Sequence, residues 1–87
     1  MQNKICPACG YKLDFIPWKN GSPADEICPS CGIQFGYDDM AGGDLEKRKE
    51  IHIRWRENWI KNGMRWFSSR SKPLNWDPIQ QLKSLHK

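Results

Sequence analysis

Four cysteines occur in this chain within two copies of one six-residue motif, Ile-Cys-Pro-x-Cys-Gly. The first copy covers residues 5–10, the second covers residues 27–32, and no cysteine lies outside them. Each Cys-x-x-Cys turn offers two thiolates to one metal ion, so two such turns can supply a complete tetrahedral set of sulfur ligands. The motifs therefore predict one metal site formed by two knuckles. Its expected ligands, together the cysteine quartet, are Cys6, Cys9, Cys28 and Cys31.

The residues around these cysteines suit tight turns. Pro7 and Pro29 each follow the first cysteine of a knuckle, where proline fixes φ at the value that a turn requires. Gly10 and Gly32 follow the second cysteine, where glycine reaches a positive φ without a Cβ clash. The interval between the knuckles suits a zinc site. Four thiolates leave no open ligand position, so we expect one structural Zn²⁺.

Two alternatives to zinc remain open at this stage. Disulfides would require an oxidising compartment, but the N-terminus has no apolar segment typical of a signal peptide. We therefore expect a cytoplasmic, metal-bound protein. Tetrathiolate sites also accept iron, so rubredoxin-like electron transfer stays as an alternative.

The chain has 87 residues, and a chain of this length builds only a marginal hydrophobic core. Zinc supplies roughly 10–16 kcal/mol of apparent binding free energy in finger-type peptides. We expect two lobes that pack as one cooperative domain, residues 1–43 and residues 44–87. The formal charge of +4 is divided unevenly, because the first lobe is net acidic and the second is strongly basic.

Alternating and turn-forming residues predict the fold of the first lobe. Apolar side chains alternate with polar ones over residues 11–16 and again over residues 33–37. Asn20-Gly21 is a strong reversal signal, and residues 25–27 read as a short return strand. These features predict a small α+β fold: a zinc ribbon of about three short antiparallel strands, followed by two α-helices. Residues 38–44 read as a flexible acidic linker.

The second lobe has clear helix signals. Asp44 is a suitable N-cap for a helix that runs to about Asn62, with Gly63 just beyond its end. Asp77 and Pro78 are typical of the start of a last helix. His52 is expected to be a packed, hydrogen-bonded histidine. The expected buried arc of the first helix is Leu45, Ile51, Ile53, Trp55, Trp59 and Ile60.

Residues 61–72 mix cations with two adjacent aromatic residues. Such a segment can bind nucleic acid, because cations contact phosphates and rings stack on bases. The structural alternative is that the rings pack on the first helix while the cations face solvent. The candidate binding residues, for a protein or for nucleic acid, are Trp18, Lys61, Arg65, Trp66, Phe67, Arg70, Lys72 and Trp76.

The knuckles, together with Trp59…Trp66 and the segment 75–78 (Asn-Trp-Asp-Pro), resemble small bacterial cysteine-rich proteins of the CPCC type. The knuckles are also similar to those of rubredoxin. The CPCC resemblance implies a zinc-ribbon-like start and a tryptophan-rich tail, and it implies no particular activity. The family often carries a further cysteine, as in Cys-Pro-Cys-Cys, where this chain has Ala8 and Ser30.

No nucleophile–base arrangement or phosphate-binding glycine loop can be placed in the sequence, so we expect no enzymatic activity. No apolar run is long enough for a transmembrane helix. The leading hypothesis is a zinc-stabilised module that binds another protein through exposed aromatic residues. The alternatives are nucleic-acid binding through residues 61–72 and electron transfer by iron.

Overall fold

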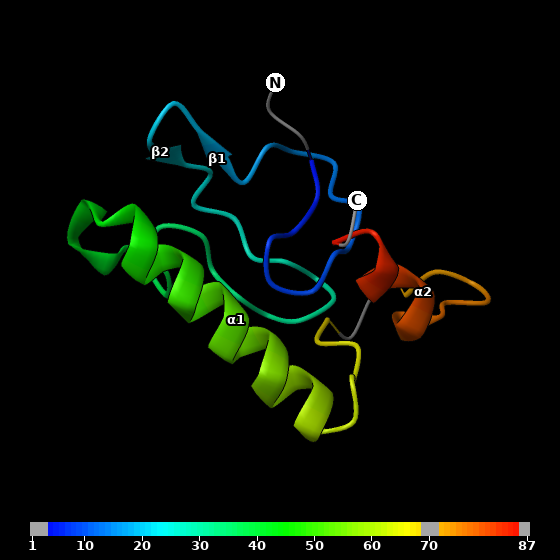
Figure 1. Ribbon diagram of the computed structural model, residues 1–87. Coiled ribbons are helices and arrows are strands. Elements are labelled where there is room, and N and C mark those ends of the chain that lie inside the picture. Colours follow the sequence, from blue (N-terminus) through cyan, green and yellow to red (C-terminus); the bar gives the residue numbers. More distant parts are fainter. Residues whose placement is uncertain (1–3, 69–71, 86–87) are drawn as a thin grey trace.

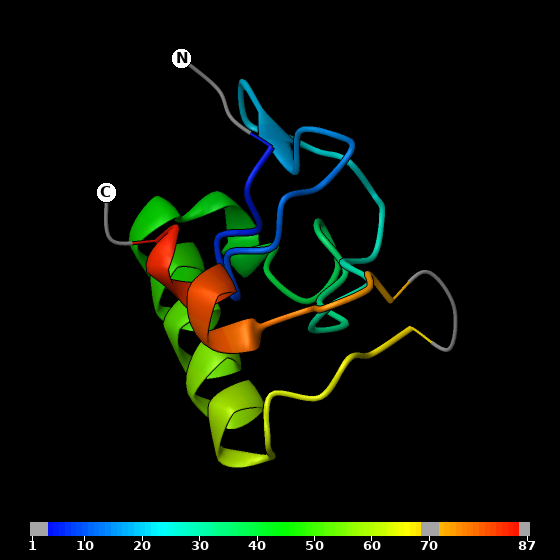
Figure 2. The ribbon, with the colours of Figure 1, turned by 90° about the vertical axis from the view of Figure 1, so that its right-hand side faces the viewer.

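The computed structural model describes residues 4–68 and 72–85 of the chain. In Figure 1 the knuckle loops, blue and teal, lie between a long helix and a short C-terminal helix, and Figure 2 shows the same arrangement from the side. In the described residues the elements are β1 (Trp18–Lys19), β2 (Ser22–Pro23), a 3-10 turn (Ala41–Gly43), α1 (Leu45–Lys61) and α2 (Pro78–Lys83).

The two strands form a minimal hairpin. β1 and β2 are antiparallel, with Trp18 opposite Pro23 and Lys19 opposite Ser22. Asn20 and Gly21 form the turn with φ of 50° and 83°. A two-residue hairpin turn with both φ values positive matches the right-handed twist of its strands. The reversal predicted at Asn20-Gly21 is confirmed.

The prediction of about three strands is wrong for the described residues, which contain a two-stranded sheet. At the knuckles, single antiparallel bridges join Ile5 to Lys12 and Ile27 to Gln34. Each knuckle closes on itself through short-range backbone hydrogen bonds, so no ladder extends beyond it. The alternation over residues 33–37 corresponds to burial at Ile33 and Phe35, which are fully enclosed, but not at Tyr37, which is 77% exposed.

Helix α1 begins and ends where the sequence predicts. The Asp44 carboxylate accepts hydrogen bonds from the backbone N–H groups of Glu46 and Lys47, at 3.0 and 3.2 Å. At the other end Gly63 has a φ of 97°, which ends the helix. Helix α2 is capped in the same way by Asp77, followed by proline at its start.

The buried face of α1 differs from the predicted arc. Trp59 is buried and Trp55 half-buried as expected, but the other enclosed residues include Arg48 and His52. Three members of the predicted arc are instead exposed: Leu45, Ile53 and Ile60. The reason is that α1 packs on loops rich in carbonyl groups and on a buried carboxylate. These partners require hydrogen-bond donors, which His52 and Trp55 provide, whereas the guanidinium of Arg48 stacks on the Trp18 ring.

The cysteine quartet lies within the hydrophobic core. The other buried members of this core are Ala8, Leu13, Ile33, Phe35 and Trp59. Trp59 comes from α1 and the rest come from the knuckle loops, so the core joins both lobes. The boundary proposed at residue 43 stays a prediction. In the part of the chain that the structure describes, no helix combines the length and apolar character needed to cross a bilayer.

Candidate metal centre

The two knuckles bring all four cysteine sulfurs together, as the sequence predicts. The four Sγ atoms lie within 4.8 Å of one another. Cys6 Sγ is 3.8 Å from Cys31 Sγ, and Cys9 Sγ is 3.7 Å from Cys28 Sγ. Both close pairs join one knuckle to the other. Residues separated by more than fifteen positions in the chain therefore form one site.

These distances fit a tetrahedral ion. A metal–sulfur distance of about 2.3 Å places the sulfurs of a regular tetrahedron about 3.8 Å apart. A disulfide would require about 2.05 Å, and all four cysteines are free thiols here. The disulfide alternative is therefore not what this structure shows. The quartet is compatible with one metal ion, and the donor set suits zinc and iron alike.

Enclosure makes the quartet unfavourable without a cation. Burial raises the pKa of the Cys6 thiol well above its ordinary value. Hydrogen bonds from Cys31 and Cys6 lower the pKa of Cys28, because they stabilise its thiolate. Without a cation the four sulfurs cannot all be thiolates at once, so some of them must keep their protons. A bound metal stabilises all four thiolates at once and removes this competition.

Side chains from both helices bind the backbone of the first knuckle. From α1, Arg56 donates to the carbonyl oxygens of Ala8 at 2.7 Å and Pro7 at 3.0 Å. From the C-terminal end, Gln81 donates to the carbonyl of Cys9 at 3.2 Å and Ser84 to that of Gly10 at 2.8 Å. These donors hold the turn in the shape that presents its two sulfurs.

The second knuckle is held in a similar way. The indole N–H of Trp55 donates to the Cys31 carbonyl at 3.1 Å. Gln81 donates to the Ser30 hydroxyl at 2.9 Å, so this one amide joins both knuckles. The backbone N–H groups of Phe67 and Ser68 donate to the carbonyls of Ser30 and Pro29. The chain after α1 therefore runs along the second knuckle and covers it.

The knuckle glycines are required by close packing as well as by their backbone. Gly10 and Gly32 have φ of 86° and 84°, which confirms the predicted positive values. A Cβ at Gly32 would lie 2.4 Å from the Phe67 ring, and one at Gly10 would lie 2.4 Å from the Gln81 carbonyl oxygen. Glycine at these positions lets the C-terminal segments approach the site.

A buried polar cluster that sequence analysis missed joins the loop after the second knuckle to α1. Asp39, within the predicted flexible linker, is fully enclosed and lies 2.6 Å from Nε2 of His52. Its carboxylate also accepts hydrogen bonds from Trp18 Nε1 at 2.9 Å and from the Gly36 N–H at 2.7 Å. The guanidinium of Arg48 stacks 3.5 Å from the Trp18 ring centre. His52 is packed and hydrogen-bonded, as expected.

The candidate binding residues are divided between internal and exposed positions. Trp18 is half-buried in the cluster just described, and Trp66 and Trp76 pack edge to face with ring centres 5.2 Å apart. Phe67 is 61% exposed although one side of its ring covers Gly32. The cations Lys61, Arg65 and Lys72 are exposed. Arg70 lies outside the described residues.

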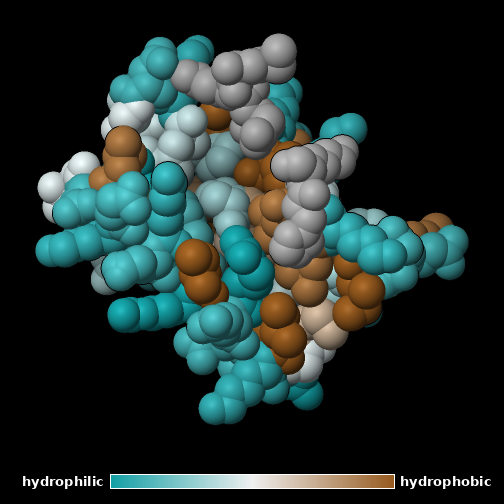
Figure 3. Space-filling view, in the orientation of Figure 1, coloured by the Kyte–Doolittle hydropathy of each residue, from teal (hydrophilic) through white to brown (hydrophobic). Residues whose placement is uncertain are grey.

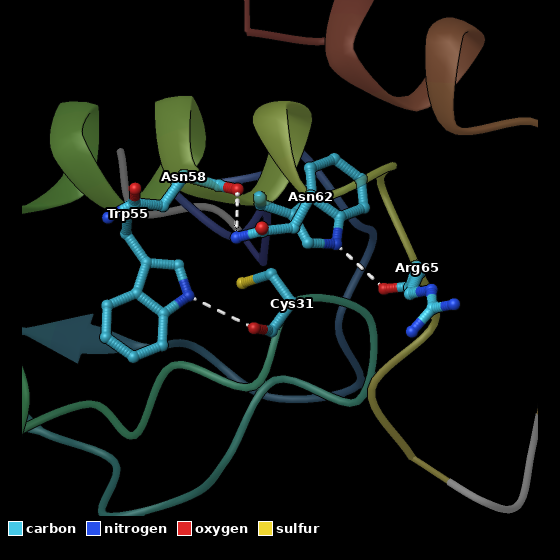
Figure 4. A pocket seen from close by; sticks show the side chains of 6 residues that line it. Cys31, Trp55, Asn58, Asn62 and Arg65 are labelled. Atoms are coloured by element: carbon cyan, nitrogen blue, oxygen red, sulfur yellow. Dashed lines mark hydrogen bonds between the residues drawn. The ribbon is translucent and has the colours of Figure 1, made fainter.

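A cavity of about 320 Å³ opens beside the second knuckle. It is lined by Cys31 together with Trp55, Asn58, Trp59, Asn62 and Arg65. Figure 4 shows the sulfur of Cys31 between Trp55 and Asn62, with α1 above it. Two of these lining residues are joined by a hydrogen bond, which the Trp59 indole N–H donates to the Arg65 carbonyl at 2.8 Å.

The supporting residues Arg56, Gln81 and Ser84 gave no signal in the sequence. They are ordinary polar residues whose partners are backbone carbonyls distant in the chain.

Comparison of this chain with protein-family models, with curated proteins and with solved structures finds no match to any of them. The resemblance to proteins of the CPCC type therefore stays a prediction, which the knuckles and the tryptophans carry.

Proposed function

We propose that the chain is a non-enzymatic binding module, stabilised by one metal ion, that recognises another protein. The observation that carries the proposal is that the cysteines are enclosed while apolar side chains of the supporting helix are exposed. The cysteine quartet is enclosed, with Cys6, Cys9 and Cys28 at 0% exposure. The helix that supports it nevertheless leaves a row of large apolar side chains in solvent. Exposed apolar side chains that gather on one face of a helix support a site of protein recognition.

Zinc is the metal that we propose. A closed set of four thiolates supplies folding energy and leaves no position for a reacting water molecule. Iron would fit the same donors and would make the protein red and redox-active. Metal analysis of the purified protein distinguishes the two: stoichiometric zinc in a colourless protein supports the proposal, and iron supports electron transfer.

The apolar row of α1 consists of Leu45, Ile53 and Ile60, which are 63%, 45% and 42% exposed. At 3.6 residues per turn these side chains lie within about 80° of one another around the helix. Figure 3 shows apolar side chains among polar ones where Figure 1 places α1. Lys49 and Arg56 fall within the same arc, so the row consists of three apolar side chains with cations between them.

Three glutamates border this apolar row: Glu46, Glu50 and Glu57. By the same helical periodicity they lie along one edge of the row. An apolar row with an acidic edge is complementary to an amphipathic helix that carries lysine or arginine beside its own apolar face. We propose a partner segment of that kind.

The test uses a photocrosslinking amino acid at position 53, with position 54 as the matched control. Ile53 belongs to the row, whereas Arg54 is the next residue and points away from it. A discrete protein adduct from position 53, abolished by Leu45→Ser with Ile60→Ser, supports the proposal. Equal adducts from both positions, or adducts to nucleic acid, would contradict it.

Nucleic-acid binding is the second candidate, and one observation favours it. A groove of about 670 Å³ is lined in part by Arg65, Lys72, Trp66 and Trp76. The ammonium of Lys72 lies 5.5 Å from the Trp76 ring centre. Binding at this groove would weaken steeply as salt rises and would be lost in Arg65→Glu with Lys72→Glu. Gel shifts at low salt without any retarded band would remove this candidate.

A further inference from the structure

The four sulfurs of the quartet are not equally enclosed. Cys6, Cys9 and Cys28 have no exposed surface, whereas Cys31 is 7% exposed. The first knuckle is covered by Arg56 and by α2, whose donors bind its carbonyl groups. Cys31 is the position at which the enclosure of the site is incomplete.

Cys31 lines a cavity large enough for a small molecule. The cavity of about 320 Å³ has Cys31 as its single sulfur-bearing residue. Figure 4 shows that this sulfur lies toward the space between Trp55 and Asn62. A reagent that enters beneath α1 would therefore meet Cys31 before the other three cysteines.

The walls of the cavity are mostly aromatic and neutral, and Arg65 is the one charged residue among the described residues that line it. The indole N–H groups of Trp55 and Trp59 already donate to the carbonyls of Cys31 and Arg65. What these two tryptophans offer is mainly ring surface, while Asn58 and Asn62 contribute neutral amides. Aromatic walls with a few neutral polar groups suit a small and largely apolar ligand.

We propose that Cys31 is a modification site, at which the thiolate sulfur attacks a small uncharged soft electrophile. With an alkyl halide, the Cys31 thiolate forms a carbon–sulfur bond as the carbon–halogen bond breaks and halide leaves with the bonding electrons. The thiolate becomes a neutral thioether, and no oxidant or reductant is involved.

The consequence of this step is loss of the metal. A thioether carries no negative charge, so the ion retains three thiolate ligands and is held less strongly. Once the ion leaves, the remaining thiols become available as the knuckles open. The order of modification should therefore be Cys31 first, followed by the other three together.

The experiment treats the metal-loaded protein with less than one equivalent of iodoacetamide and maps the label by peptide mass spectrometry. The expected result is label on Cys31 and, in parallel, metal release measured with a chromogenic chelator. In the metal-free protein the label should spread over all four cysteines. Label that appears first on another cysteine of the loaded protein would overturn the proposal.

A pair of variants tests the route through the cavity. Asn58→Trp places a large ring at the cavity wall and should slow labelling of Cys31 severalfold. Arg54→Trp puts the same ring on an exposed part of α1 outside the cavity and should leave the rate unchanged. Equal rates in the two variants would overturn the proposed route.

A second measurement needs no substitution. A maleimide coupled to a dye too large for a cavity of about 320 Å³ should label the loaded wild-type protein far more slowly than iodoacetamide does, when the rate of each reagent is divided by its rate with a small thiol peptide. Equal discrimination by the two reagents would show that the cavity does not control access to Cys31, which would also overturn the proposal.

Discussion

The carboxylate of Asp39 lies 2.6 Å from Nε2 of His52 and has no contact with solvent. This pair joins the loop that follows the second knuckle to the middle of α1. Burial by itself would raise the pKa of Asp39, but hydrogen bonds from His52, the Gly36 N–H and Trp18 outweigh it, so the pKa is lowered. The ionised carboxylate therefore contributes to stability.

Asp39→Asn tests this contribution. The amide keeps the shape of the side chain but turns an N–H group toward the donors of His52 and Trp18. We expect a loss of about 1–3 kcal/mol of unfolding free energy, measured by urea denaturation of the metal-loaded protein at pH 7.

The pH dependence of that loss follows from the lowered pKa. A carboxylate with a lowered folded-state pKa stabilises the protein above the ordinary pKa near 4, and the contribution disappears as pH falls through the folded-state value. The difference between wild type and Asp39→Asn should hold from pH 8 to pH 5 and shrink below it. A difference that grows on acidification would contradict this assignment.

Gly32→Ala and Gly43→Ala separate steric overlap from backbone strain. Both glycines have nearly the same φ, 84° and 85°, but a Cβ at Gly43 meets nothing within 4 Å. At Gly32 the Cβ would overlap the Phe67 ring at 2.4 Å. We expect Gly32→Ala to lose about 1–3 kcal/mol more than Gly43→Ala in thermal or urea unfolding.

A second change at the same site gives the control. Phe67→Ala should recover part of the stability lost in Gly32→Ala, because it removes the ring that the new methyl group strikes. If the double variant loses the full sum of the two single effects, the overlap is not the cause.

Gln81→Ala tests the support that α2 gives to both knuckles. The change removes hydrogen bonds to Cys9 and Ser30 and the acceptor of the Trp76 indole N–H, at 2.7 Å. If the knuckles lose about 1.4 kcal/mol of stabilising free energy, the rate of opening rises about tenfold. We therefore expect metal release to a chelator to accelerate about tenfold. Gln80→Ala, at an exposed position of the same helix, should release metal at the wild-type rate.

Metal removal tests the role of the quartet in folding. Because ion binding at such a site is coupled to folding, we expect a chelator to abolish the knuckles and to weaken α1, whose partners they are. Circular dichroism should show loss of helix, and one equivalent of zinc should restore it. A metal-free protein with unchanged helical signal would contradict this expectation.

Sequence alone determined the local features of this protein. The repeated motif predicted that four sulfurs converge, and their distances confirm it. The Asn20-Gly21 turn, the caps at Asp44 and Asp77, and the positive φ of Gly10 and Gly32 were predicted correctly as well. Each of these depends on a few neighbouring residues whose backbone preferences or ligand chemistry act over short range.

Tertiary structure decided which polar residues are buried. Periodicity placed Ile53 and Ile60 inside and gave no sign that Asp39 would be enclosed, and the structure shows the reverse. The physical reason is that knuckle turns expose carbonyl groups toward α1 and α2, so the surface against them must donate hydrogen bonds. Arg56 and Gln81 meet that need across nearly fifty and more than seventy positions of chain. The spacing of apolar residues does not predict such hydrogen bonds, because it contains no information on which distant backbone carbonyls need a donor.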